Sequence, residues 1–338
     1  MRFGEVPLDQ AKGAILAHSV MPGADGGGPA RFRKGLVLGP EQIDGLRAAG
    51  VARVTVALLE PGDVAEDSAA AALAAALVPD PVASGLAVSA AFTGRVNLNA
   101  VGPGIAQIDT DAVHALNRVD PAITLATLAP FSRVEQGMLV GTVKIISYAV
   151  AADRLAQACD LARAAIRVRP VVLRSASLIL TEVPGLPDKL NAKGLTAIEG
   201  RLRALGMDLA AHRVVAHDEA AIAQALVDLP GDMVLILTGS ATSDLYDTAP
   251  QALRRAGGRV ARFGMPVDPG NLLFHGQLGQ RPVIGLPGCA RSPALNGADW
   301  VLERLACGLV VSDADVAAMG VGGLLKEIPI RPQPRERP

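Results

Sequence analysis

In the second half of the chain, apolar runs alternate regularly with helix-like segments. The first apolar run, 171–181, is typical of a strand that is buried on both faces of a sheet. We predict further strands at 209–215, 233–238, 260–263 and 282–286, and helices at 193–205, 220–229, 249–256 and 293–306. Strands that alternate with helices of this length form a mainly parallel sheet. The pattern therefore predicts an α/β domain with three layers, α/β/α.

The first half of the chain predicts two smaller modules of a different kind. Residues 1–75 combine a helix-like segment, an alternating strand and a glycine-rich loop at 22–29, which indicates an α+β module. Between 76 and 150, short apolar runs are separated by Gly, Pro, Asn and Asp, which indicates a β-rich module. A helix-like segment at 153–167 leads into the α/β domain. The predicted parts are therefore 1–75, 76–150, 151–311, and a proline- and arginine-rich tail or linker at 312–338.

Composition excludes several classes of function for this chain. A net charge of −1 and an aromatic content of 3% provide neither a basic stripe nor a stacking platform for nucleic acid. The longest apolar stretch, 69–78, falls short of the roughly 20 residues that a membrane-spanning helix needs. The N-terminus lacks the pattern of a secretory signal, so we expect no membrane association and a cytoplasmic location. The three cysteines have no paired spacing, which argues against a disulfide framework or a structural zinc site.

The chemistry of the α/β domain is expected where its strands end, because ligands of open α/β sheets bind at the carboxyl ends of the strands. The strongest candidate is the loop 238–247, which follows a predicted strand directly. Gly239 would allow the backbone to approach a ligand, and the hydroxyl groups of Ser240, Thr242 and Ser243 offer hydrogen bonds. A small molecule with polar groups is the expected partner.

Two acidic residues in this loop have two interpretations. Asp244 and Asp247 could hold Mg²⁺ against a substrate phosphate, since Mg²⁺ prefers one or two carboxylates plus substrate oxygens. Alternatively they cap or solvate a turn, which composition alone favours because Asp and Ser are ordinary turn residues. The spacing of Thr248 and Gln251 is that of a capping box, so we expect the next helix to be capped at Thr248.

Two further loops carry unusual polar content. In the loop 285–293, Arg291 beside a helix N-terminus would make an anion site, with Ser292 as the N-cap and Pro293 at the first helical position. The alternative is that Pro287 and Gly288 form a simple turn and that Cys289 is a small buried residue. The third loop, 185–191, is by itself an ordinary surface turn.

Familiar catalytic and nucleotide-binding motifs are absent from the sequence. It contains no G-x-G-x-x-G after a strand and no Walker A lysine loop. The five histidines have no metal-ligand spacing, so each is expected to be structural or solvated. Ser240 lacks the flanking pattern of a nucleophile elbow.

The order of these pieces resembles one known family. The loop beginning Thr238-Gly239, followed by the stretch MPVDPGNLL…PVIGLPGCARSP, is similar to the MoaB/Mog-type molybdopterin-binding domain over about residues 170–310. That domain occurs in molybdopterin adenylyltransferases and molybdotransferases. The N-terminal segments VPLDQAKGAILAHSV and VEQGMLVGTVKII are similar to the outer domains of the molybdotransferase. The resemblance implies a central, mostly parallel sheet that holds a pterin phosphate, often with Mg²⁺, at its strand ends.

The resemblance also implies which residues form the site. Gly239 and Asp247 match the leading glycine and the closing acidic residue of the family's loop, and Asp188 and Asn191 match an acidic or amide pair after the first strand. The expected ligand-binding residues are Asp188, Asn191, Gly239, Ser240, Thr242, Ser243, Pro269, Gly270, Asn271, Gly285, Pro287, Gly288, Arg291 and Ser292, and the expected catalytic and metal-binding residues are Asp244 and Asp247. Asn271 stands where the family usually has a lysine, which removes a contact to phosphate or molybdate.

Three functions are compatible with this resemblance. The chain could carry or sense molybdopterin, or its nucleotide form, in molybdenum cofactor biosynthesis, and the missing lysine favours this reading. It could instead be a Mg²⁺-dependent nucleotidyl- or molybdotransferase. The alternative is a nucleotide pyrophosphatase resembling the competence-damage-inducible family, which shares this domain. Relatives often form dimers or trimers, so a homo-oligomer stays open.

Overall fold

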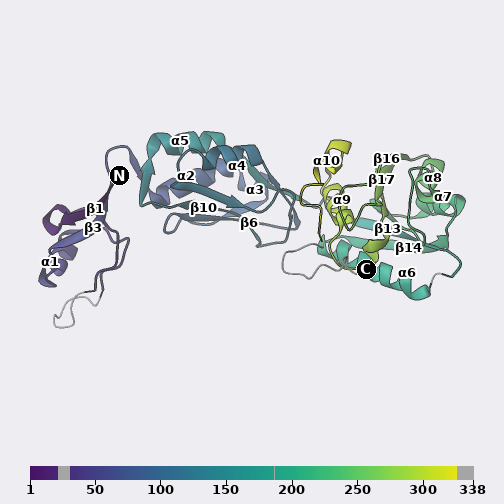
Figure 1. The fold of residues 1–338 in the computed structure, drawn as a ribbon, viewed down its shortest axis with the longest axis horizontal. Coiled ribbons are helices and arrows are strands. Elements are labelled where there is room, and N and C mark those ends of the chain that lie inside the picture. The colour runs from purple at the N-terminus through teal and green to yellow at the C-terminus, as the bar shows by residue number, and fades with distance from the viewer. Residues whose placement is uncertain (22–30, 186, 326–338) are drawn as a thin grey trace, which may run out of the picture. The chain divides into compact units, whose positions relative to one another are not determined.

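A computed structural model describes residues 1–21, 31–185 and 187–325, which form two compact units (Figure 1). Unit 1 comprises residues 1–102 and 106–169, and unit 2 comprises 103–105 and 170–338. The predicted glycine-rich loop at 22–29 and the end of the predicted tail lie outside the described residues. Within the described part of the chain, the helices are too short or too polar to cross a membrane.

Unit 2 is built on one six-stranded sheet. Its strands are β13 (Ser175–Glu182), β14 (Asp208–Ala216), β15 (Met233–Leu237), β16 (Arg259–Phe263), β17 (Phe274–Leu278) and β18 (Arg281–Leu286). They lie in the order β14-β13-β15-β18-β17-β16. The first four are parallel to one another, whereas β17 is antiparallel to both of its neighbours. The sheet is therefore mainly parallel, with an antiparallel edge.

Helices cover both faces of this sheet. Successive residues of the central strands point to opposite faces, and both sets are apolar, so each face needs a covering layer. The helices are α6 (Asp188–Ala204), α7 (Glu219–Asp228), α8 (Thr248–Arg255), α9 (Gly297–Ala306) and α10 (Asp313–Ala318). One core joins Leu178 and Leu180 of β13 to apolar residues of α6, α9 and α10. A second core joins Ile179 to residues of α7 and α8. This is the predicted three-layer α/β/α fold.

Unit 1 contains a small α+β part and a larger β-rich part, as predicted. The first part has β1 (Arg2–Pro7), β2 (Ile15–Leu16) and β3 (Arg53–Leu58) in the order β1-β3-β2, with the 3₁₀ turn η1 (Leu8–Gln10) and α1 (Pro40–Ala48). Residues such as Leu16, Leu38 and Leu46 form its own core.

The larger part of unit 1 has a four-stranded sheet and several short strands. The sheet contains β5 (Leu86–Val88), β6 (Arg95–Ala100), β10 (Leu139–Ile145) and β8 (Ile123–Thr127), in that order. The other strands are β4 (Asp63–Ala65), β7 (Gly104–Ile108), β9 (Arg133–Val134), β11 (Ala149–Ala151) and β12 (Ile166–Pro170), of which the first two residues of β7 and the last residue of β12 are assigned to unit 2. The helices are α2 (Glu66–Leu77), α3 (Pro81–Ser84), α4 (Thr110–Asn117) and α5 (Ala152–Leu161).

Three helices of unit 2 begin at residues other than those predicted. α6 starts at Asp188, so Asp188 and Asn191 lie in its first turn instead of a loop. α8 is capped by Asp247, because the Asp247 carboxylate accepts a hydrogen bond from the Thr248 N–H, so the prediction of a Thr248 cap is wrong. The N-cap predicted at Ser292 is also wrong. α9 starts at Gly297, where Asn296 and Asp299 form the capping box.

Candidate functional site

The loops that follow β13, β15 and β18 meet at one edge of the sheet. These strands are parallel neighbours, so their carboxyl ends lie together. The Gly239 N–H donates to the Thr181 Oγ1 at 2.7 Å, which joins the first two strand ends. The Arg291 Nη2 donates to the Thr238 carbonyl at 2.7 Å, which joins the loop after β18 to the loop after β15. The segments that carry Gly239–Asp247 and Gly285–Ser292 therefore lie side by side, which a shared ligand site would need.

The loop from Gly239 to Asp247 is held by its acidic residues. Asp247 Oδ1 accepts from Thr248 N at 2.7 Å, and its Oδ2 accepts from Ser243 N at 2.8 Å and Ser243 Oγ at 3.3 Å. Asp244 Oδ1 accepts from Tyr246 N at 2.7 Å. Burial acts to raise the pKa of Asp247, but the hydrogen bonds from Ser243 and Thr248 outweigh it and leave that pKa lowered. Both carboxylates thus act as turn and cap acceptors in this structure.

The hydroxyl groups of this loop differ in exposure. Ser240 and Ser243 are exposed, whereas Thr242 is buried. The N–H and the hydroxyl of Ser243 both donate hydrogen bonds to Asp247 Oδ2. Exposure of Ser240 beside the backbone of Gly239 leaves the leading end of the loop accessible to a ligand.

Arg291 is the most unusual residue at this edge. Its side chain is half-buried, and its stem packs along α6, where a Cβ on Gly194 would lie 3.5 Å from Arg291 Cγ. The Nε atom is buried, and no described residue forms a hydrogen bond with it. Burial lowers the pKa of Arg291, although a guanidinium stays charged in proteins. Among the described residues no ion pair includes Arg291, so this positive charge has no carboxylate to balance it.

A second unsatisfied atom belongs to the neighbouring helix. The Oδ1 atom of Asn191 is buried and has no hydrogen-bond partner among the residues that the structure describes. Asn191 lies one helical turn before Gly194, the residue against which the Arg291 stem packs. Leaving a buried polar atom unsatisfied costs about 1–3 kcal/mol, so such atoms commonly mark a place where water or a ligand binds.

Other predicted site residues have clear packing roles. Gly285 lies inside β18 instead of in a turn, and a Cβ there would lie 1.8 Å from the ring of Phe274. Gly270 has a φ of 141°, and a Cβ on it would lie 2.6 Å from Gly297 N. The Pro269 carbonyl accepts from Gly297 N at 2.8 Å. The turn at 269–271 therefore packs against the start of α9.

The remaining predicted residues lie around the loop after β18 and in α6. Pro287 and Gly288 open a short 3₁₀ turn, η2 (Gly288–Arg291), and Ser292 follows it. Asn271 is exposed and donates to the Met265 carbonyl at 3.3 Å. Asp188 begins α6. Arg291 and Ser292 thus lie in a turn, where the sequence predicted the start of a helix.

Two residues that support the loop were not singled out from the sequence. Thr181 is fully buried at the end of β13, and its Oγ1 lies 2.9 Å from His217 Nδ1 while it accepts from Gly239 N. An electrostatic interaction with His217 also acts to lower the pKa of Asp247. The available signal was weak: Thr181 is a polar residue that ends an apolar run, and His217 closely follows the next strand.

Comparison with known families agrees with this arrangement. Residues 179–306 match the model of a family described as "Probable molybdopterin binding domain". The matched residues lie within unit 2, so this part of the chain is similar to molybdopterin-binding domains. Residues 5–58 match a second model, described as a domain of unknown function (DUF8806). No curated protein matches the chain.

Several solved structures are similar to the chain. A molybdopterin biosynthesis moea protein from Pyrococcus horikosii is 12% identical, with a TM-score of 0.31, and the match covers 91% of this chain and 75% of that one. A molybdenum cofactor biosynthesis protein from Pyrococcus furiosus is 13% identical, with a TM-score of 0.22 and coverage of 94% and 65%. A structure of MogA is 24% identical, with a TM-score of 0.26 and coverage of 40% and 91%.

The match to the molybdopterin-binding family bears on the ligand and on the biological role of the chain. It supports a pterin-type small molecule as the ligand and a part in molybdenum cofactor biosynthesis. The converging strand ends described above belong to this domain, since β15, β18 and their loops all fall within residues 179–306.

Proposed function

We propose that the molybdopterin-binding domain binds a phosphorylated pterin, molybdopterin or its nucleotide form, with a phosphate against Arg291. One observation carries this proposal: a half-buried guanidinium at the carboxyl edge of the sheet has an unfilled Nε donor and no described carboxylate partner. Buried charges are normally paired, because an unpaired one loses hydration without compensation. A phosphate would supply both the opposite charge and an acceptor for Nε.

Asn191 supports the pterin part of the proposal. Its buried Oδ1 is an acceptor, and pterin rings carry amino and ring N–H donors. An acceptor on α6 and a donor on Arg291 would thus both be satisfied by one ligand. The exposed hydroxyl of Ser240 would add a contact at the leading end of the loop.

Between the carrier and the transferase roles, we favour the carrier. Both oxygens of Asp247 already accept hydrogen bonds that shape the loop. In the described part of the chain, His, Cys, Asp and Glu form no group of three or more that could hold a metal ion. Mg²⁺ typically completes its shell with water and substrate phosphate. We therefore propose that Mg²⁺ binds at Asp244 and Asp247 only together with the ligand phosphate.

Equilibrium binding of a fluorescent pterin phosphate to the purified chain tests the proposal. Arg291→Met should weaken binding by roughly 10- to 150-fold, the loss expected for a charge-assisted hydrogen bond of about 1.5–3 kcal/mol. Arg255→Met, which removes an exposed arginine of α8, is the matched control and should leave affinity unchanged. Equal affinity of the wild type and Arg291→Met, or equal affinity for the pterin without its phosphate, would refute the proposed site.

The same preparation separates carrier from enzyme. Turnover of ATP or CTP in the presence of molybdopterin would replace the carrier role with a transferase role. Hydrolysis of ADP-ribose-like dinucleotides would favour the pyrophosphatase alternative. Titration with Mg²⁺ in the presence and absence of the pterin phosphate tests the metal: heat of binding should appear only when the phosphate is present.

A further inference from the structure

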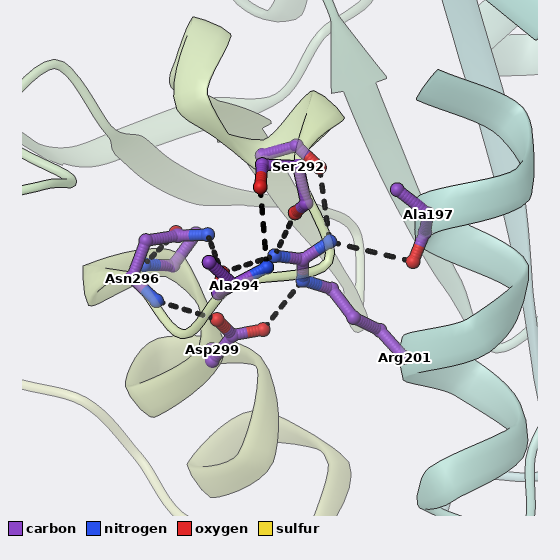
Figure 2. A network of polar contacts seen from close by, with 8 residues as sticks. Ala197, Arg201, Ser292, Ala294, Asn296 and Asp299 are labelled. Atoms are coloured by element: carbon purple, nitrogen blue, oxygen red, sulfur yellow. Dashed lines mark hydrogen bonds and ion pairs between the residues drawn. The ribbon is translucent and has the colours of Figure 1, made fainter. Parts of the chain in front are cut away.

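Arg201 of α6 is buried and uses its whole guanidinium group on one segment of the chain. Its side chain is 8% exposed. The hydrogen bonds run from Nε to Asp299 Oδ1 at 2.6 Å, from Nη1 to the carbonyls of Ala290 at 2.9 Å and Ala197 at 3.3 Å, and from Nη2 to the carbonyls of Ser292 at 2.8 Å and Ala294 at 3.1 Å (Figure 2). An arginine has five N–H donors, and all of them are engaged here.

Most of these bonds hold the segment 288–296. This segment contains only the short turn η2 and otherwise lacks a regular hydrogen-bond ladder. Three of its carbonyls, from Ala290, Ser292 and Ala294, accept from Arg201. In a helix or sheet, backbone N–H groups would donate to these carbonyls. Here the guanidinium of Arg201 donates to them instead.

The ion pair extends the same network to α9. Asp299 is buried with Arg201, and its second oxygen, Oδ2, accepts from the Asn296 N–H at 2.8 Å. Asn296 in turn caps α9 by accepting from Ala298 N at 2.9 Å. A buried ion pair is weak evidence for stability, and its better attested role is to select one arrangement over others. The network therefore fixes both ends of the segment 288–296, at η2 and at the start of α9.

Arg291 lies between two of the clamped carbonyls. Ala290 precedes it and Ser292 follows it, and both of their carbonyls bind Arg201. The backbone of Arg291 is thereby held on the α6 side while its side chain reaches the Thr238 carbonyl at the strand ends. A rotation of this backbone would move the Arg291 guanidinium away from the edge of the sheet.

We infer that Arg201 is a positioning residue, which sets the ligand affinity of the domain by holding the segment 288–296 and with it Arg291. This inference rests on the proposed function for its effect on affinity. A lysine has three donors and no planar fork, so it cannot replace the five bonds of Arg201. The segment should therefore loosen in Arg201→Lys even when unit 2 stays folded.

The chain provides its own reporters for this test. Cys289 lies within the clamped segment, and Cys307 is buried in unit 2. Because Cys289 is half-buried, an increase of its labelling rate over that of the wild type reports local opening, and labelling of buried Cys307 reports unfolding of the unit. Arg201→Lys should raise the labelling rate of Cys289 by about tenfold and change that of Cys307 little. Arg203→Lys, which alters an exposed arginine of the same helix, is the control and should change neither rate.

Affinity for the pterin phosphate gives the second readout. Arg201→Lys should weaken binding by roughly tenfold, and it should add almost nothing when Arg291 is already changed to Met, because the two residues act through one contact. Additive losses, or a lower melting temperature with unchanged affinity and unchanged Cys289 labelling, would overturn the inference.

The outcomes also separate this inference from the proposed function. If the wild type binds no pterin phosphate but Cys289 labelling rises in Arg201→Lys, the proposed ligand is wrong and the clamp on the segment stands. If Arg201→Lys does not fold, Asp299→Asn takes its place. This variant removes the negative charge of the ion pair. Its amide nitrogen also replaces one of the two oxygens that accept from Arg201 Nε and Asn296 N. A Cys289 labelling rate equal to that of the wild type in Asp299→Asn would overturn the clamp.

Discussion

The Asp247→Asn variant separates the two interpretations of the acidic loop. In the structure, Oδ1 of Asp247 accepts from Thr248 N and Oδ2 accepts from Ser243 N. An asparagine has only one oxygen, so its amide nitrogen would face one of these two N–H donors. One hydrogen bond is lost and a donor-to-donor contact replaces it, whichever way the amide is turned.

The expected loss of stability follows from these contacts. A hydrogen bond to a charged group contributes about 1.5–3 kcal/mol, and removing an N-cap costs about 0.5–2 kcal/mol. For a unit of this size, each kcal/mol lowers the melting temperature by roughly 2–4 °C. We therefore expect Asp247→Asn to lower the melting temperature of unit 2 by roughly 3–12 °C at pH 7.

The effect should depend on pH in a defined direction. The pKa of Asp247 is lowered in the folded protein, so the unfolded chain takes up the proton at a higher pH than the folded protein does. The stabilisation by the carboxylate is fully present above the ordinary pKa of an aspartate, about 3.9, and is lost as the pH falls through the folded value. The difference between the two proteins should therefore shrink below about pH 4.

Calorimetry or circular dichroism of the full chain without added metal measures this effect. Asp244→Asn is the control, because exposed Asp244 accepts one described hydrogen bond, from Tyr246 N, and an asparagine oxygen can keep it. Asp244→Asn should cost less than about 1 kcal/mol. An unchanged melting temperature of Asp247→Asn in the absence of Mg²⁺, with a loss only in its presence, would refute the capping account.

Three further predictions concern buried contacts of unit 2. Gly285→Ala should lower the free energy of unfolding, measured in urea, by at least about 1–3 kcal/mol, because the new Cβ meets the ring of Phe274. Gly200→Ala, the control with open space around it, should raise the free energy of unfolding by about 0.5–1 kcal/mol. Burial raises the pKa of Cys307 to about 12, so this thiol should resist alkylation at pH 8 until the protein unfolds. Thr181→Val removes the acceptor of the Gly239 N–H, so the Gly239 amide should exchange its hydrogen faster in NMR.

The sequence predicted the parallel core of unit 2 well, because long apolar runs and helical periodicity are properties of local segments. β17 was not predicted, since its sequence FHGQL is short and mixes apolar with polar residues. Its pairing with β16 and β18 buries His275, and this burial depends on contacts between strands. Local pattern carries no information of that kind.

The sequence predicted that the loops after β15 and β18 meet, but it did not predict the contacts that hold them. Ser292 followed by Pro293 has the local pattern of a helix start, yet the competing capping box at Asn296 determines where α9 begins. Arg201 could not be recognised from the sequence, because its partner Asp299 is 98 residues away along the chain. A buried arginine on a helix is identified only when its partners are known.

A crystal structure of the chain with a bound pterin phosphate tests the proposed phosphate site at Arg291. We expect the phosphate within hydrogen-bond distance of the Arg291 guanidinium, between the loop that begins at Gly239 and the turn η2. Electron density for the phosphate at any other place, with Arg291 still bound only to the Thr238 carbonyl, would contradict it.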